Sequence, residues 1–310
     1  MKAQLFEITH TTTYDYQSAV TVAHHLLRLA PRRLRHQIVL EHAVEVDPVP
    51  VATSVRTDYF GNEVMFVTFE SAHRRLQVTS RSKVAVAPKF VPGLAETPAW
   101  ETVRVLCRTD RSIGVLEASE FIYASPHVTL EPAFADYAAP SFPAGRPILA
   151  AVMDLTRRIH EDFRFDATAT NVSTPLAQVL EQRCGVCQDF AHLQIAGLRS
   201  LGLPARYVSG YLETMPLPGE PKLTGADASH AWVAFFCPGI GWVDVDPTNN
   251  VLPAMQHITL GWGRDFGDIS PVRGVLTGGD HHYLTVGVDV VARGEWEVDA
   301  ATAGLSLLRQ

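Results

Sequence analysis

The sequence predicts an α+β protein that has an N-terminal β domain and a core of helices packed on an antiparallel sheet. Two patterns in the chain lead to this prediction. From Met1 to about Pro88, apolar residues recur mostly at every second position, as they do in strands. Beyond residue 146, segments of helical periodicity come first and strand-like segments follow them, without the strict alternation that is typical of a parallel sheet.

Residues 1–90 are expected to form the antiparallel β domain. From Ile38 to Val46, every second position carries an apolar side chain or, once, a histidine, which is typical of a strand with one buried face. The run Asp58-Tyr59-Phe60-Gly61-Asn62 predicts a turn, and a strand is expected over Glu63 to Phe69. The alternation returns between Leu76 and Val86, and no helical pattern is found in this part.

Residues 91–146 are interpreted as an irregular connecting segment. Prolines recur through the whole stretch, and because proline breaks a helix, they keep any helix short. The segment is not of low complexity, since Trp100, Phe121 and Tyr123 are available for packing.

Residues 147–310 are expected to form the core, which begins with three helices. An apolar stripe from Val152 to Phe163 predicts the first helix. The second is expected to have Thr174 as its N-cap and Pro175 in its first position. The third extends from about Cys187 to Leu201 and ends before a glycine, a residue that favours the left-handed backbone at a helix end.

Strand-like segments complete the core. They lie at Ala205 to Glu213, His230 to Phe236, Trp242 to Asp246, and His282 to Val291. A Pro-Gly turn separates the second segment from the third, and this arrangement predicts a hairpin.

Composition excludes several classes of protein. The chain has 310 residues, more than one average domain of about 150 residues. Its formal net charge of −7 argues against a nucleic-acid-binding surface. No apolar run reaches the roughly 18 residues of a membrane helix, and no secretory signal is visible. Four cysteines are too few for a disulfide scaffold, so a cytoplasmic protein with reduced thiols is expected.

Cys187 is the first candidate functional residue. It follows Gly185, which permits a tight turn, and it begins the third predicted helix. Unpaired backbone N–H groups and the positive end of the helix dipole favour a thiolate at such a position, and the thiolate is the reactive form of cysteine. The helical spacing of Cys187, Ala191 and Ile195 turns the thiol towards the rest of the protein. Taken alone, the segment favours the alternative of a small, buried apolar cysteine.

His230 and Asp246 flank the predicted hairpin. They lie at similar distances from its turn, so they are opposite or diagonal neighbours, and their even separation places both side chains on one face. A carboxylate there can accept a hydrogen bond from one imidazole nitrogen and leave the other free for a thiol. Asp244 has the same parity but lies nearer the turn, which makes it the weaker candidate. Taken singly, His230 is explained equally well as an ordinary histidine at a strand end, and Asp246 as an ordinary aspartate in a turn.

Together these segments resemble the transglutaminase-like superfamily. The resemblance rests on the runs GVCQDFAHL, LGLPARYVSGYL, SHAW and GWVDVDPT. In that family, matching cysteine, histidine and aspartate residues form the catalytic triad, which the resemblance assigns here to Cys187, His230 and Asp246. It also implies a papain-like α+β fold for the core.

The resemblance extends beyond the core. Residues 10–16, 29–32 and 58–62 look like the β-rich N-terminal domain of the bacterial branch, and residues 263–274 look like its C-terminal segment. The match is weakest between Phe90 and Pro147. The family likeness implies a cysteine-protease-like enzyme.

Metal and redox roles are disfavoured. Cys184 and Cys187 form a C-x-x-C pair, but Cys107 and Cys237 are isolated, so a four-ligand zinc site is not expected. Two predicted helices precede the pair, which does not suit a thioredoxin-like motif. No calcium-binding loop pattern is present. We therefore expect no metal and no cofactor, and we interpret Cys184 as a packing residue.

Neighbouring polar and aromatic residues are given structural roles. Asp189 suits the dipole of the third helix, and His192 is expected to pack or to be solvated. Trp232 is expected to wall the site or to pack in the core. The two residues of each pair, His24-His25 and His281-His282, point to opposite faces of a strand, so they cannot chelate a metal well and are expected at the surface or at a sheet edge.

The expected chemistry is acyl transfer from an amide. The Cys187 thiolate attacks the carbonyl carbon, His230, oriented by Asp246, protonates the leaving amine, and the thioester passes its acyl group to water or to another amine. The Cys187 backbone N–H and the Gln182 side chain are candidate oxyanion donors.

Hydrolysis of a peptide or protein amide is favoured over amine transfer, because water is always available and no amine-binding feature can be read. A non-catalytic binding module on the same fold is the competing class. No nucleic-acid or membrane partner is expected, and the sequence does not indicate an oligomeric state.

Overall fold

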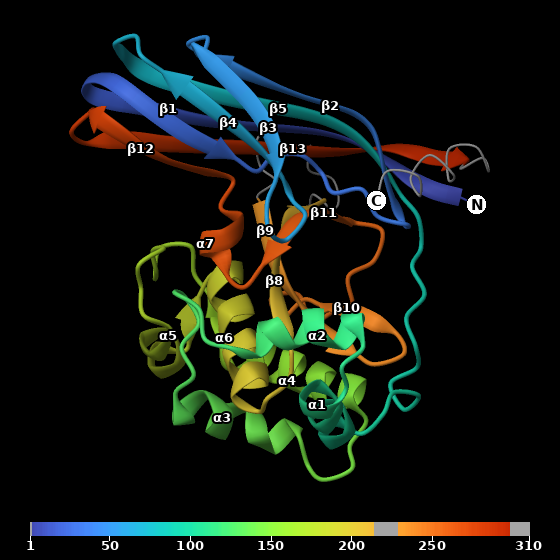
Figure 1. Ribbon diagram of the computed structural model, residues 1–310. Helices are drawn as coiled ribbons and strands as arrows, with labels where there is room; N and C mark the ends of the chain where they lie inside the picture. Colours follow the sequence, from blue (N-terminus) through green and yellow to red (C-terminus); the bar gives the residue numbers. More distant parts are fainter. Residues whose placement is uncertain (1, 214–228, 298–310) are drawn as a thin grey trace, which may run out of the picture.

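The computed structural model describes residues 2–213 and 229–297, and Figure 1 shows a β layer stacked on a helical core. In the described part of the chain, the larger sheet has the order β2-β5-β1-β4-β3, and β12 and β13 also pair with β1. Its strands are β1 (Lys2–Leu27), β2 (Gln37–Asp47), β3 (Ala52–Thr57), β4 (Glu63–Phe69), β5 (His73–Val86), β12 (Val272–Gly278) and β13 (His282–Glu297). The prediction of an antiparallel, strand-rich N-terminal part is confirmed.

The long strand β1 organises this sheet. Its first half pairs with β5 and β13, and its second half pairs with β4 and β12, in each case antiparallel. Strands β12 and β13 therefore lie in the N-terminal sheet, where Figure 1 shows them in red beside the blue β1, whereas the sequence pattern had grouped residues 147–310 with the core. Lys2 pairs with Glu297, and local sequence patterns carry no information about so distant a partner.

The core contains a second antiparallel sheet with the order β10-β9-β8-β11. Its strands are β8 (Ala205–Leu212), β9 (Ser229–Cys237), β10 (Gly241–Val245) and β11 (His257–Gly263). The predictions of β8, β9 and β10 are confirmed to within one or two residues. Strand β11 was not predicted, because it is buried on both faces and its sequence does not alternate.

Helices cover one face of this core sheet. The described helices are α1 (Trp100–Thr109), α2 (Ile113–Ser119), α3 (Pro132–Ala138), α4 (Ile148–Asp162), α5 (Leu176–Gln182), α6 (Cys187–Ser200) and α7 (Phe266–Ile269). Two 3-10 turns, η1 (Glu120–Ile122) and η2 (Ala139–Ser141), lie between them. The short strands β6 (Arg164–Phe165) and β7 (Cys184–Gly185) pair with each other. Within the described residues, no helix is long and apolar enough to cross a membrane.

The segment expected to be irregular carries α1, α2, α3, η1 and η2. Each of these pieces has ten residues or fewer, and prolines such as Pro132 and Pro140 lie in their first turns. No helical period could be read over such short stretches. Trp100 and Phe121 are buried as expected, whereas Tyr123 is exposed.

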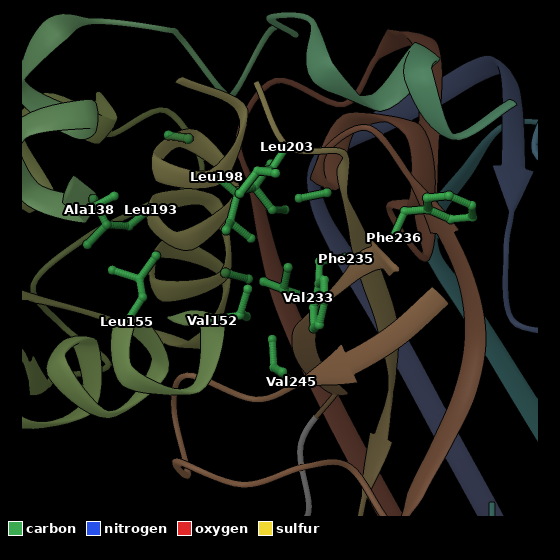
Figure 2. Close-up of a cluster of buried hydrophobic side chains, with 14 of the residues drawn as sticks. Ala138, Val152, Leu155, Leu193, Leu198, Leu203, Val233, Phe235, Phe236 and Val245 are labelled. Carbon is green, nitrogen blue, oxygen red and sulfur yellow. The ribbon is translucent and has the colours of Figure 1, made fainter. Parts of the chain in front are cut away.

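Helix α6 lies at the centre of the core. Its residues 189–199 are all buried. Figure 2 shows side chains from α6, α4 and β9 in one cluster, among them Leu198, Val152 and Val233. The helix ends where predicted, and Gly202 just beyond it has a φ of 77°. Because tertiary contacts surround α6, its first residue is held in a fixed place.

Helix α5 begins one residue later than predicted, and the expected N-cap was wrong. Pro175 has an extended backbone and precedes the helix instead of occupying its first position. Thr174 therefore does not cap α5, and its hydroxyl oxygen accepts a hydrogen bond from the backbone N–H of Asn171.

The two sheets are joined by buried side chains. This cluster consists of Phe6, Ile8, Val84, Val86, Tyr211, Ile258, Leu260, Val288 and Val290. Beside it, the Tyr211 hydroxyl lies 2.9 Å from Nδ1 of His10. The Asn62 side chain, from the predicted turn, hydrogen-bonds both the N–H and the carbonyl of Trp262. Strand β11 is therefore fixed from both sides.

Candidate active site

Cys187 is the first residue of α6, and the chain before it is held firmly. Gly185 forms a parallel bridge with Phe165, and the Asp189 carboxylate accepts hydrogen bonds from the Val186 N–H at 2.8 Å and the Thr170 hydroxyl at 2.6 Å. A Cβ added to Gly185 would lie 2.7 Å from Oδ2 of Asp189, so only glycine fits this approach. These contacts give Asp189 the structural role that was expected of it. The Cys187 thiol is half-buried and forms no disulfide.

His230 and Asp246 meet across the β9–β10 hairpin. In the observed register Val245 pairs with Val233, which makes Asp246 the diagonal neighbour of His230. Nε2 of His230 lies 2.8 Å from Oδ2 of Asp246. Both side chains are buried, and Asp246 is fully so.

Cys187 completes this row. Burial would lower the pKa of His230, but hydrogen bonds to Asp246 and Cys187, together with the charges of both groups, outweigh burial and raise that pKa to about 10. Because Nε2 of His230 faces Asp246, the ring nitrogen left for the thiol is Nδ1. The structure thus brings together the three side chains singled out in the sequence.

Asp246 is enclosed by donors. Its Oδ1 accepts from the N–H groups of Thr248 and Asn249, and its Oδ2 lies 2.7 Å from the Asn249 side-chain nitrogen and 3.1 Å from Nε2 of His257. Burial would raise the pKa of Asp246, but the hydrogen bonds from His230 and His257 outweigh it and hold that pKa well below its ordinary value. A charged carboxylate is therefore the stable form.

Sequence reasoning missed Asn249 and His257. Asn249 lies three residues after Asp246 in the same turn, and an aspartate that binds the backbone N–H groups following it is a recognisable turn pattern. No local signal pointed to His257, because it comes from the unpredicted strand β11.

Other candidates take different places. Trp232 is fully buried, and its ring centroid lies 6.1 Å from that of His230, so it packs behind the histidine. Asp244 is engaged elsewhere, since its carboxylate binds Lys89 at 2.5 Å. Gln182 ends α5 with an exposed side chain, and Cys184 is a half-buried free thiol in β7.

Three metal-ligand-type atoms cluster here. Among the described residues, ligand atoms of His230, Asp246 and His257 lie within 4.8 Å of one another. The hydrogen bonds from the two histidines to the carboxylate account for this closeness without an ion. We therefore interpret the cluster as a hydrogen-bonded group.

A surface cavity of about 360 Å³ opens beside the first turn of α6. Gln188, Asp189 and His192 line it from α6, and the rest of its wall consists of Pro126, His127, Thr129, Glu131 and residues 172–177. His192 was expected either to pack or to be solvated, and it is buried. Its Nε2 accepts a hydrogen bond from the Phe266 N–H at 3.1 Å. Cys187, His230 and Asp246 are not among its lining residues, so this cavity adjoins the helix that carries the thiol without containing the row of three side chains.

Two parts of this chain match known protein families, and most of its length matches other proteins. Residues 6–85 match the family described as "Bacterial transglutaminase-like N-terminal region", and residues 137–247 match the family described as "Transglutaminase-like superfamily". A protein of unassigned function from Mycobacterium tuberculosis is 38% identical over 295 residues, which cover 92% of each chain. A protein-glutamine gamma-glutamyltransferase from Pseudomonas aeruginosa is 36% identical over 103 residues, 32% of this chain and 15% of that protein.

The fold itself recurs in a solved structure. The crystal structure of a candidate cysteine protease from Cytophaga hutchinsonii has a TM-score of 0.75 at 19% sequence identity, covering 95% of this chain and 93% of that one. At this identity the likeness concerns the fold, and it confirms the predicted α+β architecture of the papain-like, transglutaminase-like type.

Proposed function

The chain belongs to the transglutaminase-like superfamily, a family of cysteine enzymes, and on this premise we propose that it acts on amide bonds through Cys187, His230 and Asp246. The observation that carries the proposal is the contiguous row of thiol, imidazole and carboxylate. Cys187 contacts His230, and His230 is hydrogen-bonded to Asp246 at 2.8 Å. These groups come from α6, β9 and the segment after β10.

The proposed reaction has two halves. The Cys187 thiolate forms a bond to the amide carbonyl carbon, the carbon–nitrogen bond breaks, and the imidazolium of His230 gives its proton to the leaving amine. Water then attacks the thioester, His230 takes a proton from it, and the acid leaves with regeneration of the thiolate. The Cys187 N–H lies in the first turn of α6, where amides have no intrahelical acceptor, so it is available to the oxyanion.

Hydrolysis of a peptide or protein amide is the favoured outcome. Water is always available to the thioester, and no amine-binding feature is recognised among the described residues. Amine transfer is the second candidate, and the similarity to a protein-glutamine gamma-glutamyltransferase supports it. A non-catalytic binding module is the third, but a histidine whose pKa is raised by a buried carboxylate and a neighbouring thiol is an unusual feature for a scaffold.

The experiment uses two readouts on the full chain. Iodoacetamide labelling followed by peptide mass spectrometry compares Cys187 with Cys184, Cys107 and Cys237, and Cys187 is expected to react at least tenfold faster at pH 7. A peptide library with a labelled primary amine then separates hydrolysis from amine incorporation. Cys187→Ala abolishes both, whereas the matched control Cys184→Ala retains them. Equal, slow labelling of all four thiols would instead favour the binding module.

A further inference from the structure

We propose that His257 is a positioning residue that holds the Asp246 carboxylate and shares its charge, so that His230 can release its proton. This inference rests on the proposed function, because it assigns a role within the same row of side chains. His257 begins β11, which β8 separates from the β9–β10 hairpin, and its side chain nevertheless reaches the carboxylate.

Both histidines bind the same oxygen. Nε2 of His230 lies 2.8 Å, and Nε2 of His257 lies 3.1 Å, from Oδ2 of Asp246. A charged carboxylate oxygen only accepts hydrogen bonds, so each of these ring nitrogens carries a proton. The two imidazoles therefore compete for one acceptor.

The surroundings of Nδ1, the second ring nitrogen of His257, indicate which of its two nitrogens carries the proton. Its Nδ1 is buried and has no hydrogen-bond partner among the described residues. A proton on this atom would be a buried donor without an acceptor, which is costly, whereas a bare nitrogen loses less. The Trp232 ring packs edge-on against the His257 ring, with ring centroids 5.3 Å apart. The hydrogen-bond partners therefore favour the Nε2–H tautomer of His257.

This competition has a consequence for His230. A hydrogen bond from His257 withdraws electron density from Oδ2 and makes the carboxylate a weaker partner for the His230 imidazolium. Within the described residues, the titratable groups that face His230 are Cys187 from α6, Asp246 from the turn after β10, and His257 from β11. Without His257, Asp246 would hold the proton on His230 more strongly, and proton transfer to the leaving amine would become harder.

The test measures the alkylation rate of Cys187 against pH, which needs no substrate. In a thiolate–imidazolium pair, the rate rises a second time when the imidazolium loses its proton, so this upper inflection reports His230. His257→Phe and His257→Leu remove the donor, and both are expected to move the inflection upward by about 0.5 to 1 pH unit. His257→Gln keeps an N–H donor near the position of Nε2 and is expected to stay close to wild type.

The outcomes separate the two proposals. An unchanged inflection in a folded Phe or Leu variant, or an equal shift in the Gln variant, overturns the role of His257 and leaves the proposed function intact. If wild-type Cys187 reacts no faster than Cys184, the proposed function fails first. Ring ¹⁵N shifts of wild-type His257 give an independent measurement, and a proton found on Nδ1 at pH 7 would also overturn the inference.

Discussion

His230 and Asp246 are diagonal rather than directly opposite neighbours in their hairpin, yet their Nε2 and Oδ2 atoms lie 2.8 Å apart. A diagonal pair on one face of a sheet is within reach only when a side chain leans along the strand. The donors that surround Asp246 hold it in this orientation. The geometry therefore depends on the turn that follows β10 as much as on the strands.

Asp246→Asn should lower the alkylation rate of Cys187 at neutral pH and reduce any turnover by about a hundredfold or more. An amide cannot stabilise the imidazolium, and its NH₂ group offers a donor to ring nitrogens that are themselves donors. Asp244→Asn is the matched control, because this carboxylate faces Lys89. Equal effects of the two substitutions would contradict the assignment of Asp246.

Asp189→Ala should lower the free energy of unfolding by about 1 to 2 kcal/mol. The substitution leaves the Val186 N–H and the Thr170 hydroxyl without their acceptor at the start of α6. Urea denaturation measures the loss, and Thr170→Val should show only part of it. A loss no greater than that of the neighbouring Gln188→Ala would argue against this capping role.

Gly210→Ala should destabilise the protein by about 2 to 3 kcal/mol. The added Cβ would lie 2.2 Å from the Ile258 carbonyl oxygen and 2.4 Å from the Trp232 ring, and the backbone oxygen cannot move away cheaply. Gly114→Ala is the control, since nothing lies within 4 Å of its Cβ in helix α2. In thermal or urea unfolding, Gly210→Ala should have a lower midpoint than wild type, and Gly114→Ala should have a higher one because alanine favours a helix more than glycine does.

His25 should make the protein sensitive to acid. The sequence pattern predicted this histidine at the surface or at a sheet edge, but it is buried and neither ring nitrogen has a partner in the described residues. Burial, helped by the nearby His73 and His24, lowers its pKa from 6.5 to about 4. Between these pH values the unfolded chain binds a proton that the folded protein rejects, so the free energy of unfolding falls as pH decreases, by up to about 1.4 kcal/mol per pH unit.

His25→Leu should remove this part of the acid sensitivity. Urea midpoints at pH 7 and pH 4.5 measure it, and His281→Leu, at an exposed position that does not influence the pKa of His25, serves as the control. His10, whose pKa is likewise lowered by burial to about 4, retains its own contribution in both variants. An unchanged difference between the two pH values in His25→Leu would contradict the prediction.

The candidate site could be predicted from the sequence more completely than the strand order of the larger sheet. Helix α6 could be predicted because a glycine precedes its first turn and another follows its last, and the hairpin parity related His230 to Asp246. These are local signals within about twenty residues. By contrast, the partners of β1 are set by pairing across almost the whole chain, and β11, buried on both faces, has no alternation to reveal it. His257 was missed for the same reason.

The arrangement of β1 between early and late strands also sets an order for biosynthesis. When a ribosome has made the chain as far as Gly263, one whole side of β1 still lacks the neighbours that β12 and β13 provide. An unpaired strand of that length is a template for pairing with other chains. To avoid aggregation, the nascent protein therefore depends on the segment that holds β12 and β13, or on a chaperone until that segment emerges.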